Sequence, residues 1–320
     1  MRALTFSQFG DPSVLDVREI PDPSATPGVA VVRTRAIGLN FADAYRRQGR
    51  YHLVGAPPWI AGYEASGEIA ALSPSDTAWR IGQRVAFADA PLANAELVAV
   101  PLDHLIPLPA EISHEVAAAL LLQGLTADYL LHDSCAVRQG DRVVVHAAAG
   151  GVGLLLVQLA RACGAEVFAL ASSEAKRAAA TQAGATHTGD SRGDWVAAVA
   201  AAFPAGADVV YDSIGTTVLD SLRAARTGGT VVFYGMAAGD PPAVDPRLLM
   251  DRSLRLVGGD LWNVLRTADD RRTRAARLFA EVLAGRLVVT IGERFPLERG
   301  ADAHRALEDR ERIGKLLLVP

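Results

Sequence analysis

One stretch of the chain, residues 143–160, constrains the fold more than any other. A hydrophobic run (Val143 to Val145) leads into a turn of small residues, and an apolar helix begins inside that turn. This pattern indicates a buried strand, a tight turn and a helix whose positive N-terminus can hold a pyrophosphate. Gly150 would let the backbone approach the phosphates, and Gly153 would let the helix pack closely on the strand.

The match to the G-x-G-x-x-G pattern is imperfect, because Ala148 stands where the first glycine belongs. A Gly/Ala-rich turn in any α/β protein is the alternative interpretation. A second apolar run, residues 165–171, lies at the distance that one βαβ unit requires and favours dinucleotide binding. The residues of the turn predicted to contact the cofactor are Ala149, Gly150, Gly151, Val152 and Gly153.

Length and composition exclude several classes of protein. A chain of 320 residues is too long for one ordinary core, so we expect two domains. The formal net charge of −4 provides no basic field for nucleic acid, and the apolar runs are too short and interrupted for a membrane span. Cys135 and Cys163 have no metal-ligand spacing. A reduced, cytoplasmic setting is therefore expected.

The first third of the chain is β-rich, and the pattern changes near Ser113. Short strands are expected at 30–36, 67–72, 84–88 and 95–101, with Gly and Pro between them. They predict a compact barrel or sandwich. Ser113 offers an N-cap for an apolar helix over 116–122.

From Asp141 onward, strands and helices alternate. The expected strands are 142–148, 166–171, 208–214, 230–235 and 254–258, and the expected helices are 175–183, 195–203 and 218–226. Such alternation predicts a parallel sheet covered on both faces.

The C-terminal part should return to the first domain. The pattern is a helix over 271–284, a strand over 288–290, a helix over 301–309 and a closing strand over 315–320, which needs a sheet to join. We therefore expect one domain over 1–120, completed by 264–320, and a second over 121–263.

Six segments, taken together in this order, carry a specific resemblance. They are residues 36–43, 62–67, 123–127, 146–153, 211–215 and 314–316. On these motifs the chain resembles, from end to end, the zinc-free medium-chain quinone oxidoreductases of the zeta-crystallin type. The resemblance implies an α/β fold with a GroES-like β-rich catalytic domain and a doubly wound Rossmann sheet. It also implies a homodimer formed by edge-to-edge sheet pairing, and NADPH-dependent reduction of quinones or related conjugated carbonyls.

A metal site is not expected. Zinc-containing relatives use a cysteine where Asn40 lies and a histidine where Tyr63 lies, and the chain has no cysteine cluster. Without thiolate or imidazole at these positions, a closed tetrahedral site cannot be built.

The residues beyond the second strand favour NADPH over NADH. NAD-selective sites usually place Asp or Glu about 20 residues past the glycines, and no carboxylate stands at that tip here. Ser172 can donate to a 2′-phosphate and Lys176 can neutralise it. The alternative is that Ser172 is an N-cap and Lys176 a solvated helix residue. Arg192 can replace, with a bidentate contact, the tyrosine that family members often carry near the third strand.

The residues expected at the reaction centre come from the resemblance. Asn40 would hydrogen-bond the substrate carbonyl as negative charge develops, and Thr126 would offer its hydroxyl to the carboxamide or the carbonyl. Tyr45 and Tyr51 would line the substrate mouth, where a phenol can stack on a flat quinone or donate a proton. A turn residue at position 40 and packing roles for both tyrosines are the alternatives.

Further cofactor contacts are expected at the carboxyl ends of later strands, which face the ligand in open α/β sheets. These residues are Ile214, Gly215, Tyr234, Gly235 and Met236. Lys315 is expected to reach back toward the cofactor, although a solvated lysine is an equal alternative. Leu261 and Trp262 would shape the apolar substrate pocket.

Two rival functions remain open at this point. The first is an NADPH-dependent enone or enoyl-thioester reductase, which would use the same hydride and fold. The second is a non-catalytic NADPH-binding protein, acting as a redox sensor or a structural protein, because fold does not fix function.

Overall fold

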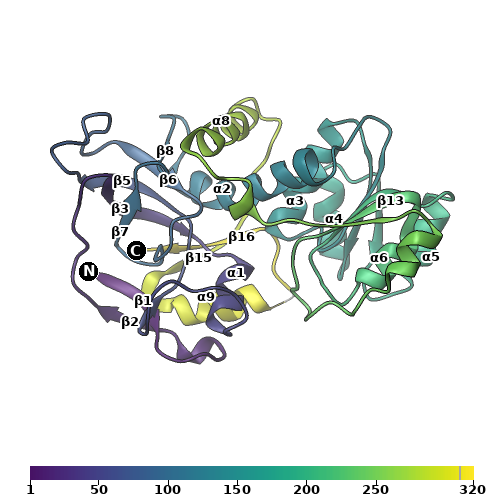
Figure 1. The fold of residues 1–320 in the computed structure, drawn as a ribbon, viewed down its shortest axis with the longest axis horizontal. Coiled ribbons are helices and arrows are strands. Elements are labelled where there is room, and N and C mark those ends of the chain that lie inside the picture. Colours follow the sequence, from purple (N-terminus) through teal and green to yellow (C-terminus); the bar gives the residue numbers. More distant parts are fainter. Residues whose placement is uncertain (310) are drawn as a thin grey trace. The chain divides into compact units, whose positions relative to one another are not determined.

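The computed structural model describes residues 1–309 and 311–320 and divides them into two compact units. Unit 1 comprises 1–122 and 265–320, and unit 2 comprises 123–264 (Figure 1). The boundaries expected from the sequence were 120 and 263. Within the described part of the chain, no helix is long and apolar enough to cross a membrane.

Unit 1 is built around a seven-stranded sheet and a three-stranded sheet. The larger sheet runs β15-β16-β3-β5-β6-β8, with β7 also paired to β3, and the smaller runs β2-β1-β4. The strands of the larger sheet are β3 (Val29–Gly38), β5 (Ala65–Ala71), β6 (Arg84–Phe87), β7 (Leu97–Pro101), β8 (Ile106–Pro107), β15 (Ile291–Pro296) and β16 (Lys315–Val319). Those of the smaller sheet are β1 (Arg2–Phe6), β2 (Asp16–Glu19) and β4 (Trp59–Ile60).

The helices of unit 1 include the first part of α2, because the boundary between the units falls within that helix after Leu122. They are α1 (Phe41–Arg47), α2 (His114–Tyr129), α8 (Ala268–Leu283), α9 (Gly300–Glu308) and the short turns η1 (Pro12–Val14) and η4 (Leu297–Arg299). The sequence predicted only 116–122 of α2, which in fact extends to Tyr129 and is followed by η2 (Leu130–Ser134).

The closing strand β16 brings the C-terminus beside residues from the start of the chain. It runs antiparallel to β3, with Leu317 opposite Gly38, and the Leu39 amide donates to the Leu316 carbonyl at 3.1 Å. This register places Lys315 beside Asn40.

The strand expected at 288–290 is displaced. β15 begins at Ile291 because its partner turns sharply at Gly314, where φ is +76°. A Cβ on Gly314 would lie 2.4 Å from the Thr290 carbonyl oxygen, so the two backbones already touch there. Regular pairing therefore starts at Ile291 opposite Lys315.

Unit 2 is a six-stranded, fully parallel sheet in the order β11-β10-β9-β12-β13-β14. The strands are β9 (Arg142–Val145), β10 (Glu166–Ala171), β11 (His187–Asp190), β12 (Ala207–Asp212), β13 (Ala225–Phe233) and β14 (Arg255–Gly258). The helices are α3 (Gly151–Ala162), α4 (Glu174–Gln182), α5 (Trp195–Ala202), α6 (Val218–Ala224), α7 (Pro246–Asp251) and the short η3 (Leu261–Asn263). This is the strand order of the doubly wound dinucleotide-binding fold. Strands are added outward from β9 toward one edge and then outward from β12 toward the other, so the order switches between β9 and β12.

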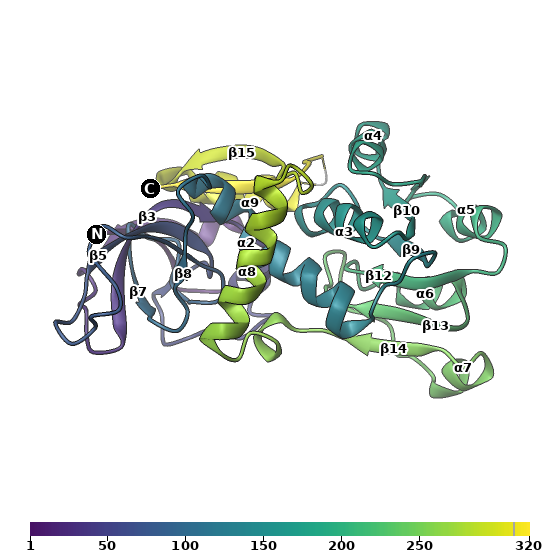
Figure 2. The ribbon, with the colours of Figure 1, turned by 90° about the horizontal axis from the view of Figure 1, so that it is seen from above.

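Helices cover both faces of this sheet, and their order can be followed in Figure 2. Right-handed crossovers put α3 and α4 on one face and α5 and α6 on the other, where α5 and α6 also contact each other. Strand β11 was not expected, because the sequence His-Thr-Gly-Asp has no apolar pattern. It is the edge strand beside β10, so it needs little apolar surface.

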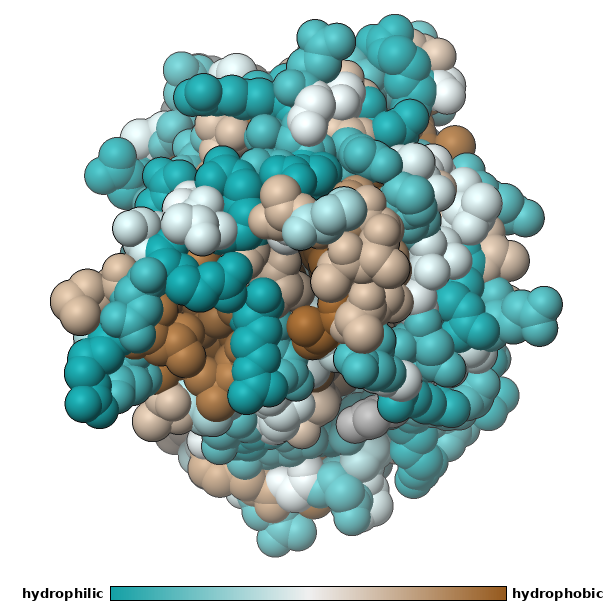
Figure 3. Space-filling model, turned by 90° about the vertical axis from the view of Figure 1, so that its right-hand side faces the viewer, coloured by the Kyte–Doolittle hydropathy of each residue, from teal (hydrophilic) through white to brown (hydrophobic). Residues whose placement is uncertain are grey.

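Each unit has its own hydrophobic core. In unit 1 the core includes Phe6, Ile37 and Phe87, all buried, and in unit 2 it includes Phe168, Val210 and Val231. Figure 3 shows one face of the molecule, on which hydrophilic residues cover most of the surface and apolar residues gather in a patch.

Candidate functional site

The glycine turn of unit 2 leaves an open cradle at the start of α3. Gly150 is the N-cap of α3, in an extended conformation, and no side chain of the described residues caps the helix. A Cβ on Gly150 would come no closer than 3.2 Å to another atom, the Ala147 carbonyl oxygen. On Gly153 it would lie 2.3 Å from that oxygen and 2.7 Å from the Ala148 Cα. The protein itself therefore requires glycine at 153, whereas at Gly150 the packing of the described residues would admit a Cβ.

The tight bend of the turn lies one residue earlier than the motif predicts. Ala147, not Ala148, has a positive φ of +47°, in the left-handed region that favours glycine. The Gly150 amide donates to the Ala147 carbonyl at 2.8 Å and closes the turn. Gly151 packs against the side chain of Gln123, whose Oε1 would lie 1.8 Å from an added Cβ.

A buried carboxylate shapes the loop after β12. Asp212 Oδ1 accepts from the amides of Ile214 (2.9 Å) and Gly215 (3.2 Å). Its Oδ2 accepts from the hydroxyls of Thr217 (2.8 Å) and Ser221 (2.7 Å). Four donors satisfy this fully buried group, and two of them are amides of the loop that carries the predicted cofactor contacts Ile214 and Gly215.

The residue that begins the glycine turn joins the same network. His146 is buried and its Nε2 lies 3.1 Å from Ser221 Oγ, while its ring packs edge-on against Trp195 at 4.8 Å. Burial lowers the pKa of His146, so the ring is neutral at pH 7. The turns after β9 and β12 are therefore linked through His146, Ser221 and Asp212, of which only Ser221 lies outside the six motif segments.

The end of β13 lies against the loop after β12. The Tyr234 amide donates to the Asp212 carbonyl at 3.0 Å. A Cβ on Gly215, whose φ is +89°, would lie 2.3 Å from the Gly239 carbonyl oxygen and 3.1 Å from the Met236 Cα. The structure thus brings together the predicted residues 214–215 and 234–236 at the carboxyl edge of the sheet.

The two serines after β10 have different roles. Ser173 caps α4, its hydroxyl accepting from the Lys176 amide at 3.4 Å. The alternative interpretation of Ser172 as the N-cap is therefore wrong. Ser172 and Lys176 are both half-buried near the tip of β10.

An acidic residue that the sequence did not single out lies beside them. Asp190 ends β11 directly opposite Ala171, the last residue of β10. Its carboxylate lies 3.8 Å from Arg177 Nη1 and accepts from the Arg192 amide at 2.9 Å. The Arg192 side chain is exposed. The tip of β10 and β11 therefore carries one carboxylate among three basic residues.

In unit 1, Asn40 has partners for every polar atom of its side chain. Its Oδ1 accepts from Lys315 Nζ at 2.8 Å. Its Nδ2 donates to Glu64 Oε2 at 3.0 Å and to the Gly38 carbonyl at 3.3 Å. Asn40 was predicted to donate a hydrogen bond to a substrate carbonyl, but both hydrogens of its amide already have acceptors in the protein.

Glu64 and Lys315 form a fully buried ion pair. Lys315 Nζ lies 2.6 Å from Glu64 Oε2, and Glu64 Oε1 accepts from the Leu122 amide at 2.6 Å. Burial lowers the pKa of Lys315, and the attraction of Glu64 and Asp43 opposes that shift. The lysine predicted to contact the cofactor has its ammonium bound within unit 1. Glu64, which sequence analysis left aside, is its counter-ion.

A second buried pair follows along α1. Asp43 Oδ1 lies 3.4 Å from Arg46 Nη1. The Arg46 guanidinium stacks over the Tyr63 ring at 3.6 Å and lies 4.9 Å from the centroid of Tyr51. Burial raises the pKa of the Asp43 carboxyl. Tyr51 is half-buried and held at the edge of this cluster.

The other residues predicted at the reaction centre are partly accessible. Tyr45, on α1, is half-buried between Phe41 (6.2 Å between centroids) and Arg50 (5.9 Å). In unit 2, Thr126 on α2 is half-buried. Trp262 is half-buried, whereas Leu261 is only 6% exposed.

The side chains near Asn40 do not fit a metal ion. Its oxygen and the Glu64 carboxylate already bind the Lys315 ammonium, and a second cation there would be repelled. Tyr63 stacks on a guanidinium. In residues 1–309 and 311–320, no group of three or more His, Cys, Asp or Glu is placed to hold a metal.

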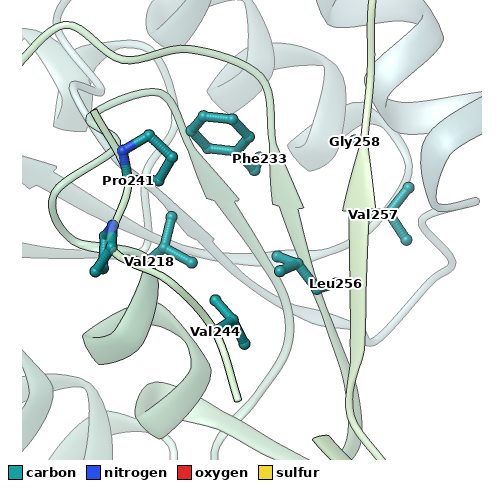
Figure 4. A pocket seen from close by; sticks show the side chains of 8 residues that line it. Val218, Phe233, Pro241, Val244, Leu256, Val257 and Gly258 are labelled. Atoms are coloured by element: carbon teal, nitrogen blue, oxygen red, sulfur yellow. The ribbon is translucent and has the colours of Figure 1, made fainter. Parts of the chain in front are cut away.

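A separate apolar cavity of about 270 Å³ lies in unit 2 beside β14 (Figure 4). It contains none of the predicted site residues. Its lining is Val218, Phe233, Pro241, Pro242, Val244, Leu256, Val257 and Gly258.

Two family models match the chain. The model described as an alcohol dehydrogenase GroES-like domain matches residues 26–110. The model described as a zinc-binding dehydrogenase matches residues 151–280.

Curated relatives match over the full length. A quinone oxidoreductase of Pseudomonas aeruginosa is 36% identical, covering 100% of this chain and 99% of the relative. A probable quinone oxidoreductase of Schizosaccharomyces pombe is 39% identical over 98% of this chain and 95% of its own length. A 2-haloacrylate reductase of a Burkholderia species is 36% identical over 99% and 98%.

Solved structures agree with these relatives. The structure of an Escherichia coli quinone oxidoreductase complexed with NADPH has a TM-score of 0.97 at 31% identity, covering all of both chains. That of mycobacterial Rv1454c complexed with NADPH has a TM-score of 0.95 at 36% identity, again over both whole chains.

Proposed function

Because the chain belongs to the quinone oxidoreductase family of medium-chain reductases, we propose that it transfers a hydride from NADPH to quinones or related conjugated carbonyls, without zinc. The observation that carries the proposal is the open cradle at Gly150, where an uncapped helix N-terminus meets the carboxyl edge of a doubly wound sheet.

The residues of unit 2 would bind and orient NADPH, which supplies the hydride. Residues 149–153 would hold the pyrophosphate on backbone amides, and 214–215 with 234–236 would contact the nicotinamide side. Ser172, Lys176 and Arg192 would bind the 2′-phosphate. The fit is chemical as well as spatial, because the Lys176 and Arg192 charges offset a dianion beside Asp190.

Tyr45 and Tyr51 would line the acceptor site, where a half-buried phenol can stack on a flat ring or donate a proton. Thr126 would place its hydroxyl near the reacting carbonyl, and Leu261 and Trp262 would shape the apolar wall. Asn40 would act by fixing the start of α1 rather than by donating to substrate, since both of its amide hydrogens are bound.

A second acceptor class is favoured by one relative, the 2-haloacrylate reductase, whose name denotes a conjugated substrate other than a quinone. An enone or enoyl-thioester would accept the same hydride at its β-carbon. We also propose that the protein is a cytoplasmic homodimer that pairs through a sheet edge, for which β14 provides one candidate edge.

The test is anaerobic oxidation of NADPH by a panel of quinones, enones and enoyl-thioesters, followed by absorbance, with NADH in parallel. Turnover of quinones with NADPH well above NADH supports the proposal. Turnover of enones alone assigns the alternative acceptor. Tight NADPH binding with no turnover on any acceptor would leave the sensor or structural role.

A further inference from the structure

The chain uses lysine at only two positions, 176 and 315, although it has 32 basic residues in all. Lys176 is half-buried at the proposed 2′-phosphate site, whereas Lys315 is 2% exposed. An ammonium ion is a compact point charge with three donors, and a guanidinium is a planar fork. In a chain that otherwise uses arginine, a buried lysine indicates a position where a compact cation is needed.

The surroundings of Lys315 match such a cation. Its Nζ lies 2.6 Å from Glu64 Oε2 and 2.8 Å from Asn40 Oδ1. The space is narrow, because a Cβ on Gly38 would lie 2.3 Å from the same Glu64 oxygen. A guanidinium is larger and carries five donors, whereas two side-chain acceptors lie at these distances.

The ammonium also decides which way the Asn40 amide points. The oxygen and nitrogen of an amide have nearly the same shape, so their neighbours select the orientation. Lys315 can only donate, and therefore it selects Oδ1. The NH2 group then faces the acceptors Glu64 and the Gly38 carbonyl. The flipped amide would set an NH2 group against an ammonium ion.

Asn40 in turn stands at the start of α1. It is the N-cap residue, and its backbone amide donates to Asp43 Oδ2 at 2.9 Å. The helix that follows carries Tyr45, one of the residues proposed to line the acceptor site. Two hydrogen bonds thus connect Lys315, through Asn40, to the helix that carries Tyr45.

We propose that Lys315 is a positioning residue, whose ammonium ion fixes the Asn40 amide and the start of α1 and thereby the acceptor side of the reaction, without contacting NADPH. This inference rests on the proposed function for its kinetic consequence. Its geometric part does not depend on any activity.

The kinetic test separates positioning from charge balance. Lys315→Met alone leaves Glu64 buried without a counter-ion, so it should destabilise the fold. The double variant Lys315→Met/Glu64→Gln removes both charges and should recover most of the melting temperature. We expect its kcat/KM for the acceptor to stay at least about tenfold low while the Kd for NADPH changes less than about twofold. Recovery of both melting temperature and kcat/KM would overturn the proposal. So would a rise in the NADPH Kd, which would assign Lys315 to the cofactor.

A spectroscopic test needs no turnover. Protein labelled with ¹⁵N at lysine has only two Nζ sites. We expect one of them, Lys315, to keep slowly exchanging ammonium protons and to shift in Asn40→Asp, while the Lys176 signal alone responds to NADPH. If neither Nζ is protected from exchange, or if NADPH shifts both, the proposal fails. If the protein reduces no acceptor but Lys315 is protected, the proposed function fails and the Lys315–Asn40 geometry stands.

Discussion

The glycine turn of unit 2 (residues 146–153) and the charge cluster of unit 1 (Asn40, Glu64 and Lys315) are built in opposite ways. The turn uses backbone atoms and small residues that are consecutive in the chain, and its working surface is the space beside Gly150. The cluster uses side chains from α1, β16 and the segment before β5, with Lys315 and Asn40 275 positions apart. A backbone-built site depends on side-chain volume, whereas a site built from buried charges depends on pairing. The two regions should therefore respond to different perturbations.

The largest effect should come from volume changes in the turn. Gly153→Ala places a Cβ against backbone atoms at 2.3 and 2.7 Å, and should destabilise unit 2 by about 3 kcal/mol. Gly150→Ala meets nothing closer than 3.2 Å, so it should change stability by less than about 1 kcal/mol while weakening NADPH binding strongly. Thermal unfolding and NADPH titration measure both. Equal stability losses would contradict the assignment of the cradle to a ligand.

The next effect is a dependence of the folding stability on pH that comes from one buried side chain, His304. His304, on α9, is fully buried, and neither ring nitrogen has a hydrogen-bond partner among the residues that the structure describes. Burial lowers its pKa from 6.5 to about 3. The unfolded chain binds a proton at His304 more readily than the folded one does. The contribution of this residue to the free energy of unfolding is therefore fully present above pH 6.5, and it falls by up to about 1.4 kcal/mol per pH unit between pH 6.5 and 3.

His304→Leu should remove that part of the acid sensitivity. Denaturant unfolding at pH 7, 6, 5 and 4 gives the slope for wild type and variant. Leu307→Ala, also on α9, changes no ionisable group; it is the matched control and should keep the wild-type slope. An unchanged slope in His304→Leu would show that this ring is not the acid-sensitive group.

Cofactor selectivity should change by a smaller amount. Lys176→Ala and Arg192→Ala should each raise the Kd for NADPH by about tenfold and leave that for NADH nearly unchanged, because each removes one charged contact to the 2′-phosphate. Arg138→Ala, in the same unit, is the control. Equal losses of affinity for NADPH and NADH would show that neither residue binds the 2′-phosphate, and would leave Ser172 as the candidate.

The smallest effect tests the strained residue of the turn. Ala147→Gly should be neutral or stabilising by up to about 1 kcal/mol, because it relieves a left-handed alanine. Ala148→Gly, at the motif position but without positive φ, should instead destabilise the protein. Chemical denaturation compares them. The reverse order would place the bend where the sequence motif predicted it.

Local patterns predicted most of the cofactor-binding unit. The strands around 143–145, 166–171 and 230–235 and the turn at 146–153 are consecutive in sequence, so composition and periodicity reveal them. The errors there have local causes. β11 was missed because an edge strand needs no apolar pattern. Ser173 rather than Ser172 caps α4 because α4 begins at Glu174, and the N-cap is the residue directly before the first helical one.

The charge cluster could not be predicted in the same way. Nothing near Lys315 in the sequence indicates Asn40 or Glu64 as partners, and the sequence predicted either a cofactor contact or a solvated lysine. The one available signal was the scarcity of lysine, since a residue type used twice in a chain rich in arginine is a candidate for a special position.

The sequence alone determined the alternation of strands and helices, the glycine turn and the family, because each depends on residues close together or on motifs in order. Only the tertiary structure decided that Ala147 bends the turn, that Asp212 fixes the loop at 214–215, and that Lys315 holds Asn40. Each of these depends on which distant groups the register of the sheet brings within hydrogen-bond reach. The register is set by which face of each strand is buried, and burial is a property of the whole fold.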